Sequence, residues 1–234
     1  MANKSILILI LLASLLAGCG ITGREVGPTA TPAEFATLEF SQPTTLPISP
    51  PTQNQPPSII ATPMQIPSVQ QTILDQAFVI INLLKNSDMQ ELSLHVRPQM
   101  GLRFSPYATV KDSDQVFSPD QVAGLMTDPT VYLWGNYDGS GEPINLNFAD
   151  YYAKFVYDED FFNAPQIALN HRLGTGNSID NASVYYPGSM VVEFYFPGFD
   201  PQYTGMDWLS LRLVFMQQGY DWFLVGIIHD QWTI

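Results

Sequence analysis

The sequence predicts an α+β fold in which N-terminal helices pack on a bent antiparallel sheet. Segments with the helical period come first, between residues 68 and 126, and strand-like segments joined by loops rich in Gly, Asn and Pro fill most of the C-terminal part. A chain that places its helices before its strands is typical of α+β domains, whereas α/β domains alternate the two. We therefore expect an antiparallel meander at the C-terminus.

A helix is predicted to open the domain at Ser68. Residues 69–87 contain neither Gly nor Pro, and apolar side chains recur at the helical spacing from Ile73 to Leu84. Serine is favoured at the N-cap, because its hydroxyl accepts a hydrogen bond from a backbone N–H of the first turn. The helix should therefore begin directly after Ser68.

Three further helices are predicted. Asp88, with Glu91 three residues later, has the pattern of a capping box, and Pro98 ends this short helix. Ser118 followed by Pro119 marks the start of the next helix. A helix over residues 148–157 would present aromatic side chains on one side, namely Phe148, Tyr151, Tyr152 and Phe155.

The strands are predicted from alternating and aromatic-rich segments. Residues 101–110 are expected to be extended. Residues 130–137 and 142–148 flank the turn signal Asp138-Gly139-Ser140-Gly141, so they should form a hairpin. Four strand-like segments complete the chain, at residues 165–173, 189–196, 208–216 and 221–232.

The register of the last two strands assigns each side chain to a face. If Met216 lies opposite Asp221, one face is apolar and includes Leu224 and Ile228, with Asp230 in phase. That face needs a cover, which the helices supply. The opposite face collects mainly polar and aromatic side chains, which are Glu193, Tyr195, Trp208, Ser210, Arg212 and His229.

Asp230 is the candidate functional carboxylate of the helix-covered face. Burial at the end of the last strand would raise its pKa and make it a candidate acid or base. Together with Trp222 and Trp232 it forms the candidate ligand-binding set. The alternative is that the strand has left the core at this point and that Asp230 is exposed.

Glu193, Arg212 and His229 look like a catalytic set in the sequence, but the predicted register directs them away from the helices, together with Trp208. We therefore expect solvated charge pairs, or a contact surface for a partner such as a second copy of the chain. Arg172 is interpreted as a loop-edge residue.

The N-terminal residues 1–18 have the pattern of a signal peptide. A single positive charge, Lys4, precedes an apolar segment over residues 6–16, which is too short to cross a bilayer as a helix. The chain's one cysteine, Cys19, follows. The sequence Leu16-Ala17-Gly18-Cys19 resembles the lipobox of bacterial lipoproteins, and this resemblance implies a diacylglyceryl group on Cys19 and an anchor on the extracytoplasmic side of the cell membrane. The alternative is an ordinary cleaved signal.

Composition limits the partners. Residues 19–67 are rich in Pro and Thr, which predicts a disordered tether before one folded domain over residues 68–234. A formal net charge of −13 argues against binding to nucleic acid. The sequence contains neither a His/Cys cluster nor a Gly-x-Ser-x-Gly motif, so we predict no metal and no cofactor.

The element order and the aromatic-rich strands of residues 68–234 resemble the NTF2-like cone, in which helices lie on the concave face of a bent sheet. The resemblance implies a fold but no single activity. Three functions stay open: a non-catalytic module that binds a protein or a small molecule, an enzyme of isomerase, cyclase or hydrolase type with Asp230 as acid or base, and a structural or assembly lipoprotein of the envelope.

Overall fold

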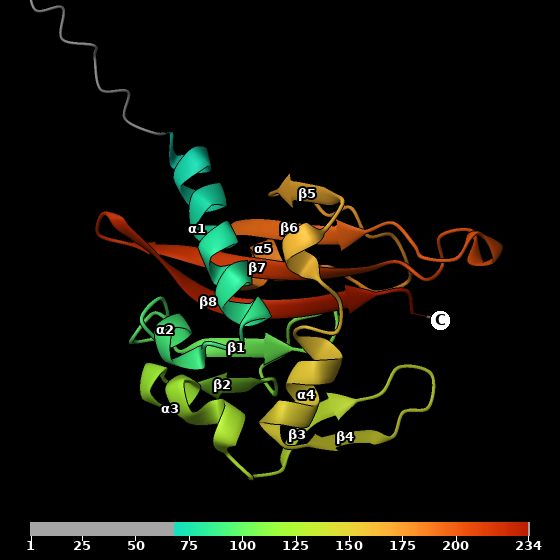
Figure 1. The fold of residues 1–234 in the computed structure, drawn as a ribbon, viewed down its shortest axis with the longest axis horizontal. Helices are drawn as coiled ribbons and strands as arrows, with labels where there is room; N and C mark the ends of the chain where they lie inside the picture. The colour runs from blue at the N-terminus through green and yellow to red at the C-terminus, as the bar shows by residue number, and fades with distance from the viewer. Residues whose placement is uncertain (1–67, 234) are drawn as a thin grey trace, which may run out of the picture. The chain divides into compact units, whose positions relative to one another are not determined.

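The computed structural model describes residues 68–233 (Figure 1). The predicted signal peptide, the lipid on Cys19 and the tether lie outside the described residues, so they stay predictions. Within the described part of the chain, no helix is long and apolar enough to cross a membrane.

The helices begin where the capping residues predict. The Ser68 side chain accepts a hydrogen bond from the backbone N–H of Gln71, and the Asp88 side chain accepts one from Glu91. Ser118 forms a complete capping box. The helices are α1 (Val69–Lys85), α2 (Met89–Ser93), α3 (Pro119–Gly124), α4 (Phe148–Phe155) and α5 (Ala182–Tyr185), of which α5 was not predicted.

The main sheet has six strands in the order β2-β1-β8-β7-β6-β5, and β3 and β4 form a separate hairpin. Strand β8 lies inside the sheet, between β1 and β7. Strand β1 pairs with β8 in parallel, so the sheet is not wholly antiparallel. The strands are β1 (Leu102–Ser105), β2 (Gln115–Phe117), β3 (Tyr132–Asn136), β4 (Pro143–Leu146), β5 (Gln166–Leu169), β6 (Met190–Phe196), β7 (Leu209–Gln218) and β8 (Asp221–Gln231).

The predicted register of β7 and β8 is wrong in two places. Gln218, not Met216, lies opposite Asp221. The pairing then shifts between Phe215↔Leu224 and Val214↔Gly226, so β8 carries a bulge. A bulge inserts one residue and exchanges the faces of everything beyond it.

The bulge therefore moves two predicted site residues. His229 pairs with Leu211 and lies on the helix-covered face, where its ring contacts Phe155 edge-on at 5.6 Å. Asp230 pairs with Ser210 and lies on the opposite face. Gly226 lies beside the bulge, and a Cβ there would make a tight contact of 3.3 Å with the Val214 side chain.

Aromatic side chains fill the space between the helices and the sheet. Trp134 stacks on Tyr151 with ring centroids 3.7 Å apart, and Phe104 contacts Phe148 at 5.2 Å. All four side chains are buried. Helices α1, α2 and α4 lie in front of the sheet in Figure 1, and α5 lies behind it. The α+β architecture is the predicted one, with N-terminal helices packed on one face of the sheet, and the resemblance to the NTF2-like cone stays a prediction.

Candidate ligand-binding site on the outer face of the sheet

The face of the sheet opposite α1 is covered by a segment of the same chain. We call residues 170–189 the strap. It connects β5 to β6, contains α5, and packs Ala182 and Tyr186 against Val214 and Ile228 of the sheet. The outer face is therefore a second buried layer rather than a solvated surface.

The prediction that the outer face is solvated is thus wrong. Glu193, Arg212, His229 and Trp208 are each at most 2 % exposed. Glu193, Arg212 and Trp208 lie on the predicted face, but beneath the strap. A partner that approached this face would contact the strap there, and the homodimer stays a prediction.

Glu193 fixes the first part of the strap. Its carboxylate accepts hydrogen bonds from the Ser210 hydroxyl at 2.7 Å and from the backbone N–H of Leu173 at 2.5 Å, and a longer one from Gly174 at 3.5 Å. Backbone N–H groups that converge on an anion stabilise its charge. The glycine-rich stretch 173–177 therefore binds an anion, and the anion is the protein's own carboxylate.

Trp208 explains why the strap needs glycine. Its indole N–H donates to the Thr175 carbonyl at 2.8 Å, which draws the strap onto the ring. A Cβ at Gly174 would lie 2.4 Å from the Trp208 ring. Only glycine permits this approach, so the sequence of the strap is matched to the tryptophan beneath it.

Two arginines and two aspartates form an ionic cluster beside Glu193. Arg172 Nε lies 2.8 Å from Asp230, and Arg212 lies 2.8 Å from Asp180 and 3.5 Å from Asp230. Arg172 also donates to the carbonyl of Ser178 at 3.1 Å and to its hydroxyl at 2.7 Å. The cluster thereby joins β7 and β8 to the strap.

The charges in the cluster hold one carboxyl in its ionised form. Burial acts to raise the pKa of Asp180, but the Arg212 charge, a hydrogen bond from Ala182, a hydrogen bond from Arg212 and the Arg172 charge together lower that pKa below its ordinary value. Asp180 is therefore an ion-pair partner at neutral pH and is not a proton donor.

A cavity of about 160 Å³ lies between the strap and the sheet. Arg172, Arg212 and Asp180 contribute to its wall, together with Val191 of β6 and five further residues of the strap, which are Asn170, His171, Ala182, Ser183 and Ser189. Arg212 and Ser189, two of the residues that line the cavity, each hold a buried polar atom without a hydrogen-bond partner among residues 68–233, namely Arg212 Nε and Ser189 Oγ. Such unpaired groups are rare in folded proteins, since each retains the cost of leaving water.

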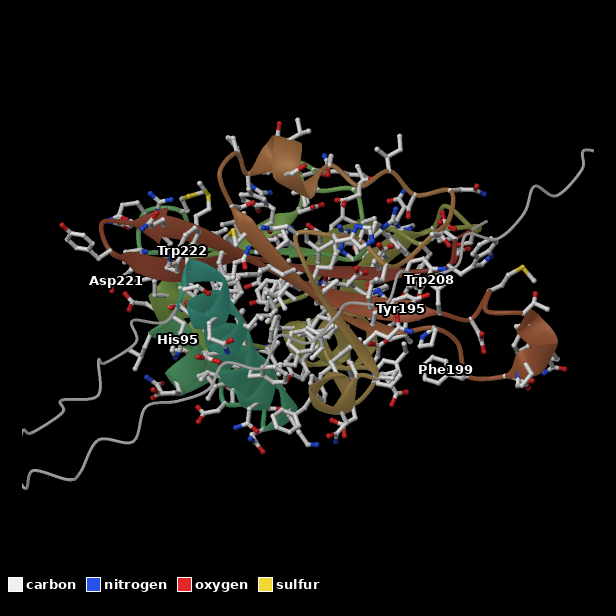
Figure 2. All side chains as sticks on the ribbon, turned by 90° about the horizontal axis from the view of Figure 1, so that it is seen from above. His95, Tyr195, Phe199, Trp208, Asp221 and Trp222 are labelled. Carbon is white, nitrogen blue, oxygen red and sulfur yellow. The ribbon has the colours of Figure 1, made fainter. Side chains whose placement is uncertain are left out.

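The predicted ligand set of Asp230, Trp222 and Trp232 is not brought together. Trp222 lies at the start of β8, on the helix side, and Figure 2 shows it at the opposite end of the sheet from Trp208. Trp232 follows the end of β8 and is 38 % exposed. Asp230 is buried, as predicted for a functional carboxylate, but on the outer face and against Arg172.

His229 meets a carboxylate on the other side of the sheet. Its Nε2 lies 3.1 Å from Asp158, and its Nδ1 has no partner within the described part of the chain. A histidine beside a carboxylate can take and return a proton. The ring itself is fully buried against Phe155, however, so no substrate atom reaches it in this structure.

A larger and more open groove of about 780 Å³ runs between residues 106–114, the β3–β4 hairpin and residues 177–179. Most of its wall is formed by loops, with Lys111, Asp114 and Asp138 as charged side chains. Burial raises the pKa of Asp114 despite hydrogen bonds from Ser105 and Lys111. The groove carries charges of both signs and lacks the concentrated arginine pair of the smaller cavity.

Sequence reasoning missed the residues of the strap. Arg172 was interpreted as a loop-edge residue, yet its side chain is only 16 % exposed and pairs with the buried Asp230. Asp180 and Ser189 were not singled out. Gly226 inside a strand is the signal that could have located the bulge and so assigned Asp230 to the same face as Arg212. Residues 68–233 contain no group of three or more His, Cys, Asp or Glu that could hold a metal ion.

Comparison with known proteins adds little to this geometry. A candidate calcium/calmodulin dependent protein kinase II association domain from Xanthomonas campestris matches 70% of this chain and 89% of its own, at 10% identity and with a TM-score of 0.31. No protein-family model and no curated protein matches the chain. A TM-score this low carries no argument, so the site rests on its own contacts.

Proposed function

We propose that this protein is a lipid-anchored extracytoplasmic lipoprotein whose folded domain is a non-catalytic binding module. The cavity beneath the strap carries the proposal, because it combines two guanidinium groups with buried polar atoms that have no partner within residues 68–233. A polar cavity with unpaired donors favours a ligand that supplies acceptors. The membrane anchor rests on the lipobox-like sequence at Cys19.

A catalytic role for Asp230 receives no support from the geometry. The carboxylate forms ion pairs with Arg172 and Arg212, and it faces away from the helix side of the sheet. The filled core beneath the helices favours a second candidate, a structural or assembly lipoprotein that takes no small ligand. The two candidates differ in whether the cavity beneath the strap binds a small ligand.

Equilibrium dialysis separates the two candidates. The purified full chain would be dialysed against a small-molecule extract of a bacterial culture, and retained compounds would be identified by mass spectrometry. Ser189→Leu fills the cavity beneath the strap, and the control Ser113→Leu obstructs the larger groove instead. The binding module predicts retention by the wild type and by Ser113→Leu only. No retention by any of the three chains contradicts it and favours the structural role, and equal retention by all three chains contradicts the assignment of the ligand to the cavity beneath the strap.

The anchor has its own test. Cys19→Ser removes the thiol that a lipid transfer requires, so the variant should move from the membrane fraction to the soluble fraction after expression in a bacterial host. If the variant still fractionates with membranes, the lipoprotein assignment is wrong.

A further inference from the structure

We infer that a second copy of this chain binds at the open edge of the sheet, where its β5 strand pairs antiparallel with β5 of the first copy about a two-fold axis. This inference goes beyond the proposed binding function, because the contact uses neither the cavity beneath the strap nor the ionic cluster. Three features of the edge carry it, namely its open backbone groups, its apolar surroundings and its lack of charge.

The backbone of β5 is open on one side. Strand β5 forms one edge of the six-stranded sheet, and no further strand of the described residues lies beyond it (Figure 1). The Asn170 N–H donates to the Val191 carbonyl of β6 at 2.7 Å. Alternate residues of an antiparallel strand bond to the same neighbour, so Ala168 also faces β6, whereas Ile167 and Leu169 direct their N–H and C=O groups to the open edge. Such an edge is a template for another strand.

The other surfaces of the sheet are less accessible to a second sheet. The strap covers the outer face, as described above. At the opposite edge, the Gln115 side chain of β2 donates to the Leu133 carbonyl of β3 at 2.9 Å, so the β3–β4 hairpin lies beside that strand. The β5 edge is therefore the surface on which pairing of two sheets is least obstructed.

An exposed apolar strip lines the helix side of the β5 edge. The Phe78 ring of α1 lies edge-on to Phe162 at 6.4 Å and to Phe194 at 5.7 Å, and Phe194 pairs with Ile167 of β5. Phe78, Phe162 and Ile167 are each 36–40 % exposed. Stable interfaces bury about 1,200–2,000 Å² in total, which is more than a four-residue strand supplies. Burial of this strip would add apolar area to the backbone pairing.

The absence of charge fits a second copy. In a two-fold contact each segment meets its own copy, so a charged residue near the axis would meet a like charge. Residues 161–170 contain no charged residue, although the chain carries a formal net charge of −13. Lys85 lies over the Phe162 ring at 5.2 Å, and Asp160 pairs with it at 2.9 Å. Two copies can therefore pair along β5 without bringing like charges together.

The symmetry also suits an anchored chain. The two-fold axis between antiparallel strands of one sheet is perpendicular to that sheet, so both α1 helices lie on the same side of the combined sheet. Ser68, at the start of α1, is then on that side in both copies. The proposed lipid on Cys19 can anchor both copies in one membrane, which raises their effective concentration.

The axis fixes the register of the contact. All four new hydrogen bonds lie within β5 when Ile167 is opposite the partner's Leu169, and Ala168 is then opposite the partner's Ala168. Opposite residues that share no hydrogen bond have Cα atoms about 4.5 Å apart. A disulfide needs a Cα separation of about 4.4–6.8 Å, so a cysteine at position 168 should cross-link the two copies.

Analytical ultracentrifugation of the full chain with Cys19→Ser, at increasing concentrations, tests whether the dimer forms. We expect a concentration-dependent dimer. Ile167→Lys brings two charges into the contact and should weaken dimerisation about tenfold or more. Val116→Lys is the matched control, because Val116 lies on the opposite edge strand β2 and is 39 % exposed, against 37 % for Ile167. Thermal melts establish that both variants are folded.

Cysteine cross-linking tests the register and does not depend on the lysine variants. Ala168→Cys in the Cys19→Ser chain should form a disulfide-linked dimer on oxidation, and Val116→Cys should not. The inference is overturned if the chain is monomeric at every concentration, if Ile167→Lys dimerises as tightly as the parent chain, or if Ala168→Cys cross-links no faster than Val116→Cys. Retention of a compound by a monomeric chain in the dialysis experiment would leave the proposed function standing without this contact.

Discussion

Replacement of Arg212 by Met should destabilise the domain by removing the centre of the ionic cluster. The two side chains have similar lengths, so packing changes little, but Asp180 and Asp230 lose a positive charge. Breaking a buried ion pair by removing one partner costs about 3–5 kcal/mol, because the other charge stays buried without compensation.

The structure places the expected loss near the lower end of this range. Asp230 keeps Arg172 at 2.8 Å, and Asp180 is 33 % exposed, so water can replace part of what it loses. We expect the free energy of unfolding to fall by about 3 kcal/mol. For a domain of this size that corresponds to a fall in melting temperature of about 6–12 °C.

The pH dependence gives the prediction a second component. The pKa of Asp180 is lowered in the folded state, so the stability that this group contributes is present above its unfolded pKa of about 3.9 and is lost as the pH falls through the folded value. The difference between wild type and Arg212→Met should therefore shrink below about pH 4.

Denaturant unfolding at neutral and acidic pH measures both components, and Asp180→Asn alone and combined with Arg212→Met completes a double-mutant cycle. The coupling should be about 0.5–3 kcal/mol, the range for residues in contact. A loss below about 1 kcal/mol at neutral pH, the value typical of an exposed pair, would show that the cluster is solvated and would refute the reasoning.

Three further predictions follow from the packing. Gly174→Ala should cost about 1–3 kcal/mol, since its Cβ would overlap Trp208; an unchanged denaturation midpoint would show that the strap does not lie on the indole. His229→Ala should cost about 1–3 kcal/mol rather than the small loss expected at a solvated face, because it leaves Asp158 without a partner, and chemical denaturation would measure this. Burial raises the pKa of Tyr152 to about 12. The stability that this group contributes is therefore present below about pH 10 and is lost as the pH rises through about 12. Spectrophotometric titration should detect this late ionisation, and a normal tyrosine titration would contradict the prediction.

The sequence was sufficient to predict most of the helices and strands, because the signals that specify them are local. The caps Ser68, Asp88 and Ser118 act on backbone groups within one turn, and the four aromatic side chains predicted on one side of α4 are all buried. The hairpin turn at residues 138–141 is equally local. The order of helices and strands then predicted the fold class.

The site could not be predicted because it depends on long-range contacts. One inserted residue at the bulge next to Gly226 decides whether His229 or Asp230 faces the helices, and the hydrophobic alternation of β8 fits either choice. The strap is polar and glycine-rich, with none of the periodicity that is typical of an element packed on a sheet. Its position on the sheet comes from hydrogen bonds to Glu193 and from the contact with Trp208, which are distant in the sequence.

Hydrogen exchange tests most directly whether the outer face of the sheet is the binding face. The full chain would be compared with and without the compounds that it retains in dialysis. We predict slower exchange in the strap, residues 170–189, and at the end of β8, with little change elsewhere. Protection confined to residues 106–114 and 137–141 would place the ligand in the larger groove, and protection around Asp158 would place it on the helix side, and either result would contradict the account.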